Sequence, residues 1–297
     1  SFIDETVKPN KLYYYIVRAI DGEGRGYDSE VAGPVKPTGE LFHSGRKWVL
    51  VGLIVLSAVI LYSLYTAHEG MRIRRIPGLE AVDEAIGRAT EMGRPVLYVL
   101  GLAGASSLTT IASMNILAQV AKRCAEYETR LIVPCYDPVV MNIVREIVRN
   151  SYSQAGRPDL YRESDIFFLS DVQFAYAAAV DGIMMRERPG AVFLQGYFYA
   201  ESLILAETAN TIGAIQIAGT TADAQLPFFI AACDYTLIGE EMFAASAYLS
   251  RDPKLLGTIR GQDIGKLILI FLLLIGVFLE LLGVHWLTAF FDISQTR

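Results

Sequence analysis

The chain has 297 residues, of which 53% are hydrophobic, and a formal net charge of −6 at pH 7. An acidic chain without a Lys/Arg-rich block excludes a nucleic-acid partner, because phosphates require a basic face. The three histidines, His43, His68 and His285, lie outside the folded part of the central region. This placement excludes Ser-His-Asp and Cys-His catalysis there as well as histidine-bound zinc, and we predict neither metal nor cofactor.

Residues 1–37 predict an antiparallel β-hairpin. Lys11–Asp21 is rich in aromatic and β-branched residues, Gly22–Gly26 is a turn cluster, and Ser29–Val35 is a second extended segment. The pattern resembles the last two strands of a fibronectin type III domain, which implies a spacer or adhesion module. We expect the domain to begin upstream of Ser1 and residues 38–46 to link it to the membrane.

Two apolar segments, residues 47–66 and 265–288, predict transmembrane helices, because about 20 apolar residues span a bilayer. Basic residues concentrate on the cytoplasmic side of spans. The flanks facing the central region carry seven of them: Arg72, Arg74, Arg75, Arg251, Lys254, Arg260 and Lys266. The opposite flanks carry three: Arg46, Lys47 and Arg297. We therefore expect a cell-membrane protein with residues 67–264 in the cytoplasm and both termini outside, including the tail 289–297. Trp48 and Trp286 would share the outer interface.

Glu280 lies about thirteen residues into the second span. An ionisable residue within a membrane is a candidate functional group. The alternative is a carboxyl near the outer headgroups, protonated or bonded to a neighbouring helix. A single Glu without a partner on the first span does not make a proton path.

The central region predicts an α/β fold with a doubly wound, mostly parallel sheet of about five strands. Short, continuously apolar runs alternate with helical patterns, as in strands covered on both faces. The predicted strands are Val96–Leu100, Leu131–Val133, Ile166–Leu169, Ala191–Leu194 and Ala214–Ala218. Asp137 and Pro138 predict a helix start as N-cap and N1 residues, and Ser170-Asp171 predicts another cap.

Ligands of such sheets bind beyond the carboxyl ends of the strands, so the loops there hold the candidate binding residues. These are Gly101, Gly104, Ser106 and Ser107 after the first strand, Glu201 after the fourth, and Gly219 and Thr220 after the fifth. The glycine-rich loop opens a helix, which favours an anion. It has neither the P-loop Lys nor the GxGxxG spacing, and a tight turn capped by Ser106 or Ser107 is the alternative. For Glu201, the alternative is an acidic residue stabilising a first helical turn.

Enzymatic chemistry has weaker support. Glu201 and Asp223 could form a carboxylate pair, whereas Glu240 and Glu241 point to different faces of a helix. Cys135 could be a reactive thiol, but no His or Lys close in sequence would lower its pKa. Cys124, Cys135 and Cys233 contain no CxxC pair and predict buried, reduced thiols of a cytosolic domain.

Four short segments carry a resemblance to a known family. They are Arg75–Leu79, Ala200–Leu203, Ile217–Thr220 and Ala232–Glu241. They resemble an uncharacterised family of bacterial and archaeal membrane proteins, in which fibronectin type III repeats precede a membrane-anchored domain of unknown function. The resemblance covers roughly residues 70–265. It implies the architecture and brings no activity or site residues.

We expect a membrane-anchored scaffold or assembly protein. Its partners would be the lipid bilayer and either further copies of itself or other membrane and cell-surface proteins. Two spans and the alanine-rich helices expected over Asp234–Leu249 motivate this interpretation. The alternatives are a nucleotide- or small-ligand-sensing module using Gly101–Ser107 and Gly219–Thr221, and an enzyme using Glu201 with Asp223 or Cys135. A transporter is disfavoured, because two spans do not easily form a path.

Overall fold

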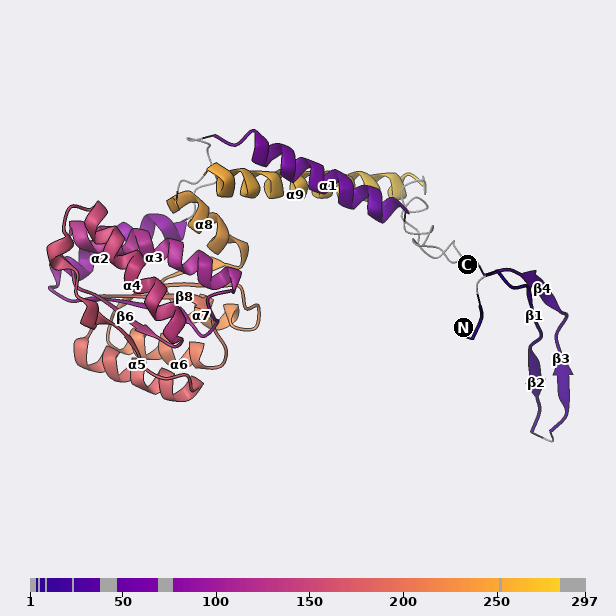
Figure 1. The fold of residues 1–297 in the computed structure, drawn as a ribbon, viewed down its shortest axis with the longest axis horizontal. Coiled ribbons are helices and arrows are strands. Elements are labelled where there is room, and N and C mark those ends of the chain that lie inside the picture. The colour runs from indigo at the N-terminus through magenta and orange to yellow at the C-terminus, as the bar shows by residue number, and fades with distance from the viewer. Residues whose placement is uncertain are drawn as a thin grey trace. The chain divides into compact units, whose positions relative to one another are not determined.

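The computed structural model describes residues 4, 6–8, 10–22, 24–37, 47–68, 77–250 and 253–283 (Figure 1). The predicted linker 38–46 and tail 289–297 lie outside these residues, as does Trp286. The chain divides into two compact units, which we describe separately. One comprises residues 1–58 with 268–297, and the other comprises residues 59–267.

The N-terminal segment forms short antiparallel pairs. Its strands are β1 (Tyr13–Tyr15), β2 (Arg18–Ile20), β3 (Gly26–Asp28) and β4 (Ala32–Val35). β2 pairs with β3 and β1 pairs with β4, both antiparallel. The predicted hairpin is therefore confirmed, but each of its halves is broken in two, and the second half begins at Gly26 rather than Ser29. Within the part of the chain that the structure describes, these strands make two-stranded sheets and no sandwich.

The larger unit contains a six-stranded parallel sheet. Its strands are β5 (Val96–Gly101), β6 (Leu131–Cys135), β7 (Ile166–Phe168), β8 (Ala191–Tyr197), β9 (Ile215–Thr220) and β10 (Tyr235–Ile238). Their spatial order is β10-β9-β8-β5-β6-β7. The α/β class and all five predicted strands are confirmed. The prediction of helix throughout Asp234–Leu249 is wrong, because its first residues form β10 and pair with β9.

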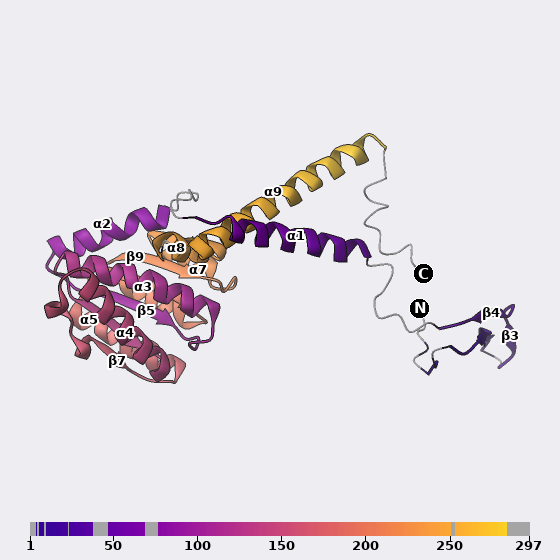
Figure 2. The same ribbon diagram turned by 45° about the horizontal axis from the view of Figure 1, so that its top comes forward.

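Helices cover both faces of this sheet (Figures 1 and 2). They are α2 (Pro77–Glu91), α3 (Leu108–Glu126), α4 (Pro138–Gln154), α5 (Gln173–Glu187), α6 (Glu201–Thr211), α7 (Leu226–Ala232) and α8 (Glu240–Ser250). Two short 3₁₀ turns, η2 (Pro158–Leu160) and η3 (Glu163–Asp165), precede β7. Helices α2, α3, α4 and α8 pack on one face, and α5, α6 and α7 pack on the other.

Two predicted helix starts have different outcomes. The Asp137 side chain accepts hydrogen bonds from the Val139 and Val140 amides at the start of α4, which confirms it as the N-cap. The cap predicted at Ser170-Asp171 is displaced, because α5 begins after Val172 and has no side-chain cap. Ser170 instead accepts a hydrogen bond from the Val172 amide within the preceding loop.

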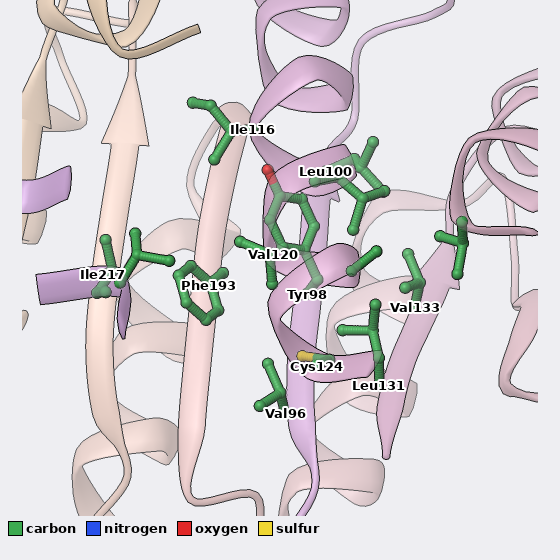
Figure 3. Close-up of a cluster of buried hydrophobic side chains, with 14 of the residues drawn as sticks. Val96, Tyr98, Leu100, Ile116, Val120, Cys124, Leu131, Val133, Phe193 and Ile217 are labelled. Carbon is green, nitrogen blue, oxygen red and sulfur yellow. The ribbon is translucent and has the colours of Figure 1, made fainter. Parts of the chain in front are cut away.

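The core explains why the strands are continuously apolar. Figure 3 shows Val96, Tyr98 and Leu100 of β5 beneath α3, on the face that Phe193 of β8 also shares. Leu97 and Val99 alternate with them and pack against the helices of the other face. Every residue of β5 is thus buried, as expected for a central strand with helices on both sides.

Two apolar helices complete the described structure: α1 (Lys47–Tyr65) and α9 (Pro253–Leu281). Among the described residues, α9 alone is long and apolar enough to cross a membrane, and α1 has a shorter apolar stretch, Val49–Tyr65. α9 begins twelve residues before the predicted span, which started at residue 265. Leu256 and Ile259 in its first turns pack with Ala247 of α8.

Candidate functional site

The strand order places a topological switch point at the centre of the sheet. Counted along the chain, the first parallel strand, β5, lies beside the fourth, β8, and the later strands extend away on either side. Ligands of open α/β sheets bind outside the carboxyl ends of the strands at such a point. The loops after β5 and β8 therefore form the candidate site, and both contain residues that the sequence pattern selected.

Two glycines close the carboxyl ends of β5 and β8 against each other. A Cβ on Gly101 would lie 2.5 Å from the carbonyl oxygen of Tyr197, and a Cβ on Gly196 would lie 1.8 Å from that of Leu100. The backbone of Gly101 also has φ +77°, which favours glycine. Gly101 thus permits the two strands to approach each other.

The loop after β5 contacts the loop after β9 through a pair of threonines. Thr109 in the first turn of α3 lies 2.8 Å from Thr221, hydroxyl to hydroxyl. Ser107 is the N-cap residue of α3 by position, but its side chain makes no capping hydrogen bond, and Ser106 is exposed. The structure therefore brings Gly101–Ser107 and Gly219–Thr221 to one end of α3.

A carboxylate lies beside the glycine-rich loop. Oδ1 of Asp137 accepts the Val139 amide at 2.6 Å, whereas Oδ2 lies 3.5 Å from the position of a Cβ on Gly104. A phosphate bound at Gly104 would meet this negative charge. A carboxylate after the second strand of a doubly wound sheet is instead suited to accept hydrogen bonds from sugar hydroxyls.

Gly219 and Thr220, at the end of β9, contact groups inside the α/β domain. The buried side chain of Gln195 crosses from β8, and its Oε1 would lie 2.2 Å from a Cβ on Gly219. Its amide nitrogen donates to the Ile217 carbonyl, and Oε1 is buried without a hydrogen-bond partner. The Thr220 hydroxyl accepts the Ala222 amide at 3.1 Å and shapes the turn. Gln195 follows the predicted fourth strand in the sequence, but the structure places it within β8, with its side chain inside the sheet.

Glu201 lies on the other face of the sheet, at the start of α6. Its position in the first turn is confirmed, but it is fully buried. One carboxylate oxygen accepts the Tyr199 amide at 2.9 Å, and the other accepts a hydrogen bond from Gln173 of α5 at 2.5 Å. These bonds join the start of α6 to the start of α5 and use both oxygens of the carboxylate.

The residues of the enzyme hypothesis lie in different environments. Cys135 is buried in β6, its thiol faces the Val133 carbonyl, and burial raises its pKa to about 12. A thiol with this pKa is not a thiolate at neutral pH and is a poor nucleophile. Asp223 is exposed after β9. Glu280, the intramembrane candidate, lies in the last turn of α9.

A cavity of about 440 Å³ opens at the opposite, amino edge of the sheet, and Arg94, Glu128, Arg130 and Glu187 are among the residues that line it. Arg130 holds Asp165 through two hydrogen bonds of 3.0 and 2.7 Å and Glu187 through one of 2.9 Å. The ion pairs of Arg130 thus link the start of β6 to the end of α5 and to the turn before β7.

Comparison with known proteins adds the family. A family model described as a domain of unknown function (DUF6754) matches residues 37–291. The chain belongs to this family. The match covers α1, the whole α/β unit and α9, and it begins after the N-terminal strands. No curated protein matches the chain, and no solved structure matches it.

Proposed function

We propose that this protein is a membrane-anchored scaffold whose α/β domain assembles with further copies or docks a partner. The observation that carries the proposal is the continuity of α9. Its first turns pack into the α/β unit through Leu256 and Ile259, and the same helix continues through the apolar, exposed stretch Leu267–Leu281. A helix of this kind can attach the domain to a bilayer.

The remaining architecture follows the charge pattern. Basic residues flank the α/β domain more heavily than the outer ends of α1 and α9, which supports a cytoplasmic domain with both termini outside. In this arrangement α1 is the second span, and the N-terminal strands are the end of an outer fibronectin type III-like module. The 19-residue length of α1 and its apolar composition support that role.

The surface best suited to assembly is the face formed by α5, α6 and α7. It exposes Phe174, Leu203, Phe228 and Ile230, and apolar side chains on adjacent helices are typical of interaction surfaces. α6 packs beside both α5 and α7. We call these four residues the lower-face patch.

Assembly by extending the sheet is disfavoured at both edges. At the β7 edge, the Arg145 guanidinium donates to the Ile166 carbonyl at 3.2 and 3.0 Å. At the β10 edge, the Ile238 amide donates to Glu241 at 3.2 Å. Charged side chains on edge strands oppose pairing with another chain.

The decisive experiment is the mass of the full chain extracted in native membrane discs. We expect a defined assembly larger than a monomer, or a stoichiometric complex with another protein. Leu203→Glu with Ile230→Glu should reduce it to monomer, while Val139→Glu, an exposed apolar position on α4, should leave it intact. A monomer in discs, together with no partner after crosslinking in membranes, would contradict the proposal.

A second candidate, a sensor of a nucleotide or another sugar-containing small ligand, is favoured by the strand order. The switch point lies beside Gly104 and Asp137, and the contact between Thr109 and Thr221 orders the loops around it. A thermal-shift panel of nucleosides, nucleotides and sugar phosphates tests it. A Cβ at Gly104 meets only Asp137, so Gly104→Val should fold and lose the shift. No shift across the panel would eliminate this candidate.

A further inference from the structure

Basic and acidic side chains are divided unequally between the two halves of the central sheet. Residues 189–250 form β8, β9 and β10 with α6, α7 and α8, and they contain six acidic residues but no Lys, Arg or His. Residues 77–188 form β5, β6 and β7 with their helices and contain eleven Lys and Arg residues. Because β8 to β10 are neighbours in the sheet, the half without basic residues is also one side of the domain.

Two of the six carboxylates in the half without basic residues have no partner. Four bind other groups of the fold, namely those of Glu201, Asp234, Glu240 and Glu241. Glu207 and Asp223 are exposed, and neither carboxylate makes a hydrogen bond or an ion pair among the described residues. These two charges are therefore available to another molecule.

The lower-face patch is continuous across the starts of three helices. Gln173 of α5 donates to Glu201 of α6 at 2.5 Å, and Ser202 of α6 donates to Gln225, the residue before α7, at 2.7 Å. These bonds hold the first turns of α5, α6 and α7 together, and three of the four patch residues lie in those turns. Figure 1 shows α5 and α6 side by side beneath the sheet.

Exposed carboxylates border this patch. Glu207 lies one turn after Leu203 on the exposed side of α6, and Asp223 lies in the loop that leads to Phe228 of α7. Asp171, in the loop before α5, is a third exposed acidic residue beside the patch. The surface thus combines large apolar side chains with negative charge at its border.

We propose that the lower-face patch docks a segment of another protein that carries both apolar and basic side chains. The inference rests on the proposed scaffold function and names the partner that it leaves open. Burial of the apolar side chains would stabilise the complex, and Lys or Arg at the border would meet Glu207, Asp223 and Asp171. Charges at the border of an interface select the partner through their sign.

The same charges disfavour the other occupants. A second copy that met this patch through its own patch would bring apolar and acidic side chains only. Arg186 is the one basic residue of α5, α6 and α7, and it lies twelve residues after Phe174, which is about 18 Å along α5. The cytoplasmic surface of a bilayer is negative and would repel the patch.

Photo-crosslinking of the full chain in the membranes of its own cells tests the proposal. Phe228→benzoylphenylalanine places the crosslinker in the patch, and Val139→benzoylphenylalanine, an exposed position on α4, is the control on the other face. We expect an adduct with one other protein at position 228 and not at 139. Sequencing of the crosslinked partner segment should find apolar residues and more Lys and Arg than Asp and Glu. A partner segment without an excess of basic residues would overturn the proposal.

Charge variants in the same assay separate recognition by charge from apolar contact alone. Glu207→Lys with Asp223→Lys should lower the yield of the adduct at least about fivefold, because attraction becomes repulsion. Glu207→Gln with Asp223→Asn, which removes the charges without reversing them, should give an intermediate loss. Glu84→Lys with Glu91→Lys makes the same change of charge at exposed positions of α2 and should leave the yield unchanged. Equal yields from the two lysine variants would overturn recognition by charge.

The products at position 228 distinguish failure of this inference from failure of the scaffold function. An adduct of the chain with itself would overturn the basic partner and leave the scaffold standing. No adduct, with an assembly larger than a monomer in native membrane discs, would have the same consequence. No adduct together with a monomer in discs would contradict both.

Discussion

The carboxyl edge of the central sheet, where its strands end, and the amino edge, where they begin, are stabilised by different contacts. The carboxyl edge joins β5 to β8 through Gly101 and Gly196 and links its loops through the neutral pair Thr109 and Thr221. The amino edge is held by ion pairs, with Arg130 between Asp165 and Glu187. The strands can approach at the carboxyl edge because glycine has no side chain, whereas the amino edge is stabilised by ion pairs.

This difference shows which of the two edges has a polar group that could bind a ligand. The charges of Arg130 and its partners are used within the fold, although a cavity opens beside them. At the carboxyl edge, Oδ2 of Asp137 lies beside an accessible glycine-rich loop while Oδ1 caps α4. A hollow surface alone therefore does not identify the better candidate for ligand binding.

The largest expected effect is at the carboxyl edge. Gly196→Ala would place a methyl group 1.8 Å from the Leu100 carbonyl oxygen, so β5 and β8 would have to separate. We expect a loss of more than about 3 kcal/mol of unfolding free energy, as for severe overpacking in a core. Urea unfolding followed by circular dichroism measures it. Gly87→Ala in α2 meets no atom within 4 Å and should be neutral or stabilising, and equal behaviour of the two variants would disprove the close junction.

An intermediate effect is expected at the amino edge. Arg130→Met would leave Asp165, whose side chain is 8% exposed, without its cation. We expect a loss of about 2 kcal/mol, below the usual figure for a buried pair because Arg130 itself is partly exposed. Arg149→Ala, which breaks an exposed pair with Glu146, is the matched control and should cost under about 0.5 kcal/mol. A loss for Arg130→Met no larger than the control would show that the amino edge does not depend on its charges.

The smallest effect is expected for Asp181 in α5, a carboxyl that takes part in the contacts of neither edge. Burial raises the pKa of Asp181 in α5, and its Oδ1 is buried without a hydrogen-bond partner. A raised carboxyl pKa means that the folded state binds the proton more tightly, so stability rises as pH falls through that pKa. Asp181→Asn should therefore stabilise the domain at pH 7, by under about 1 kcal/mol, and the gain should shrink as the pH is lowered. Urea midpoints at neutral and acidic pH measure this, and a gain that grows on acidification would refute the assignment.

Much of the fold could be predicted because apolar runs are local. The five predicted strands are buried on both faces, which leaves a continuous signal in the sequence. β10 was missed because it has only four residues and is followed by the alanine-rich helix α8. The run Tyr235–Ile238, bounded by Asp234 and Gly239, is the signal that could have identified it. The order of the strands is a property of pairing between distant segments and has no local signature.

The candidate site was less predictable for a related reason. The loops were found, since they follow the strands, but the roles of their residues depend on tertiary partners. Gly219 makes room for Gln195, and Glu201 binds Gln173 of another helix. An acidic residue in a first helical turn gives no sign that it will be buried. Helix caps are local by comparison, and the cap by Asp137 was predicted correctly.

The packing of α9 on α8 has a consequence for where this helix can gain or lose a residue. Leu256 and Ile259 contact Ala247 from one side of α9, three positions apart. Each residue of an α-helix advances the chain by about 100° and 1.5 Å. One residue inserted between Leu256 and Ile259 would therefore turn Ile259 by about 100° away from α8, so this part of the helix tolerates no change of length.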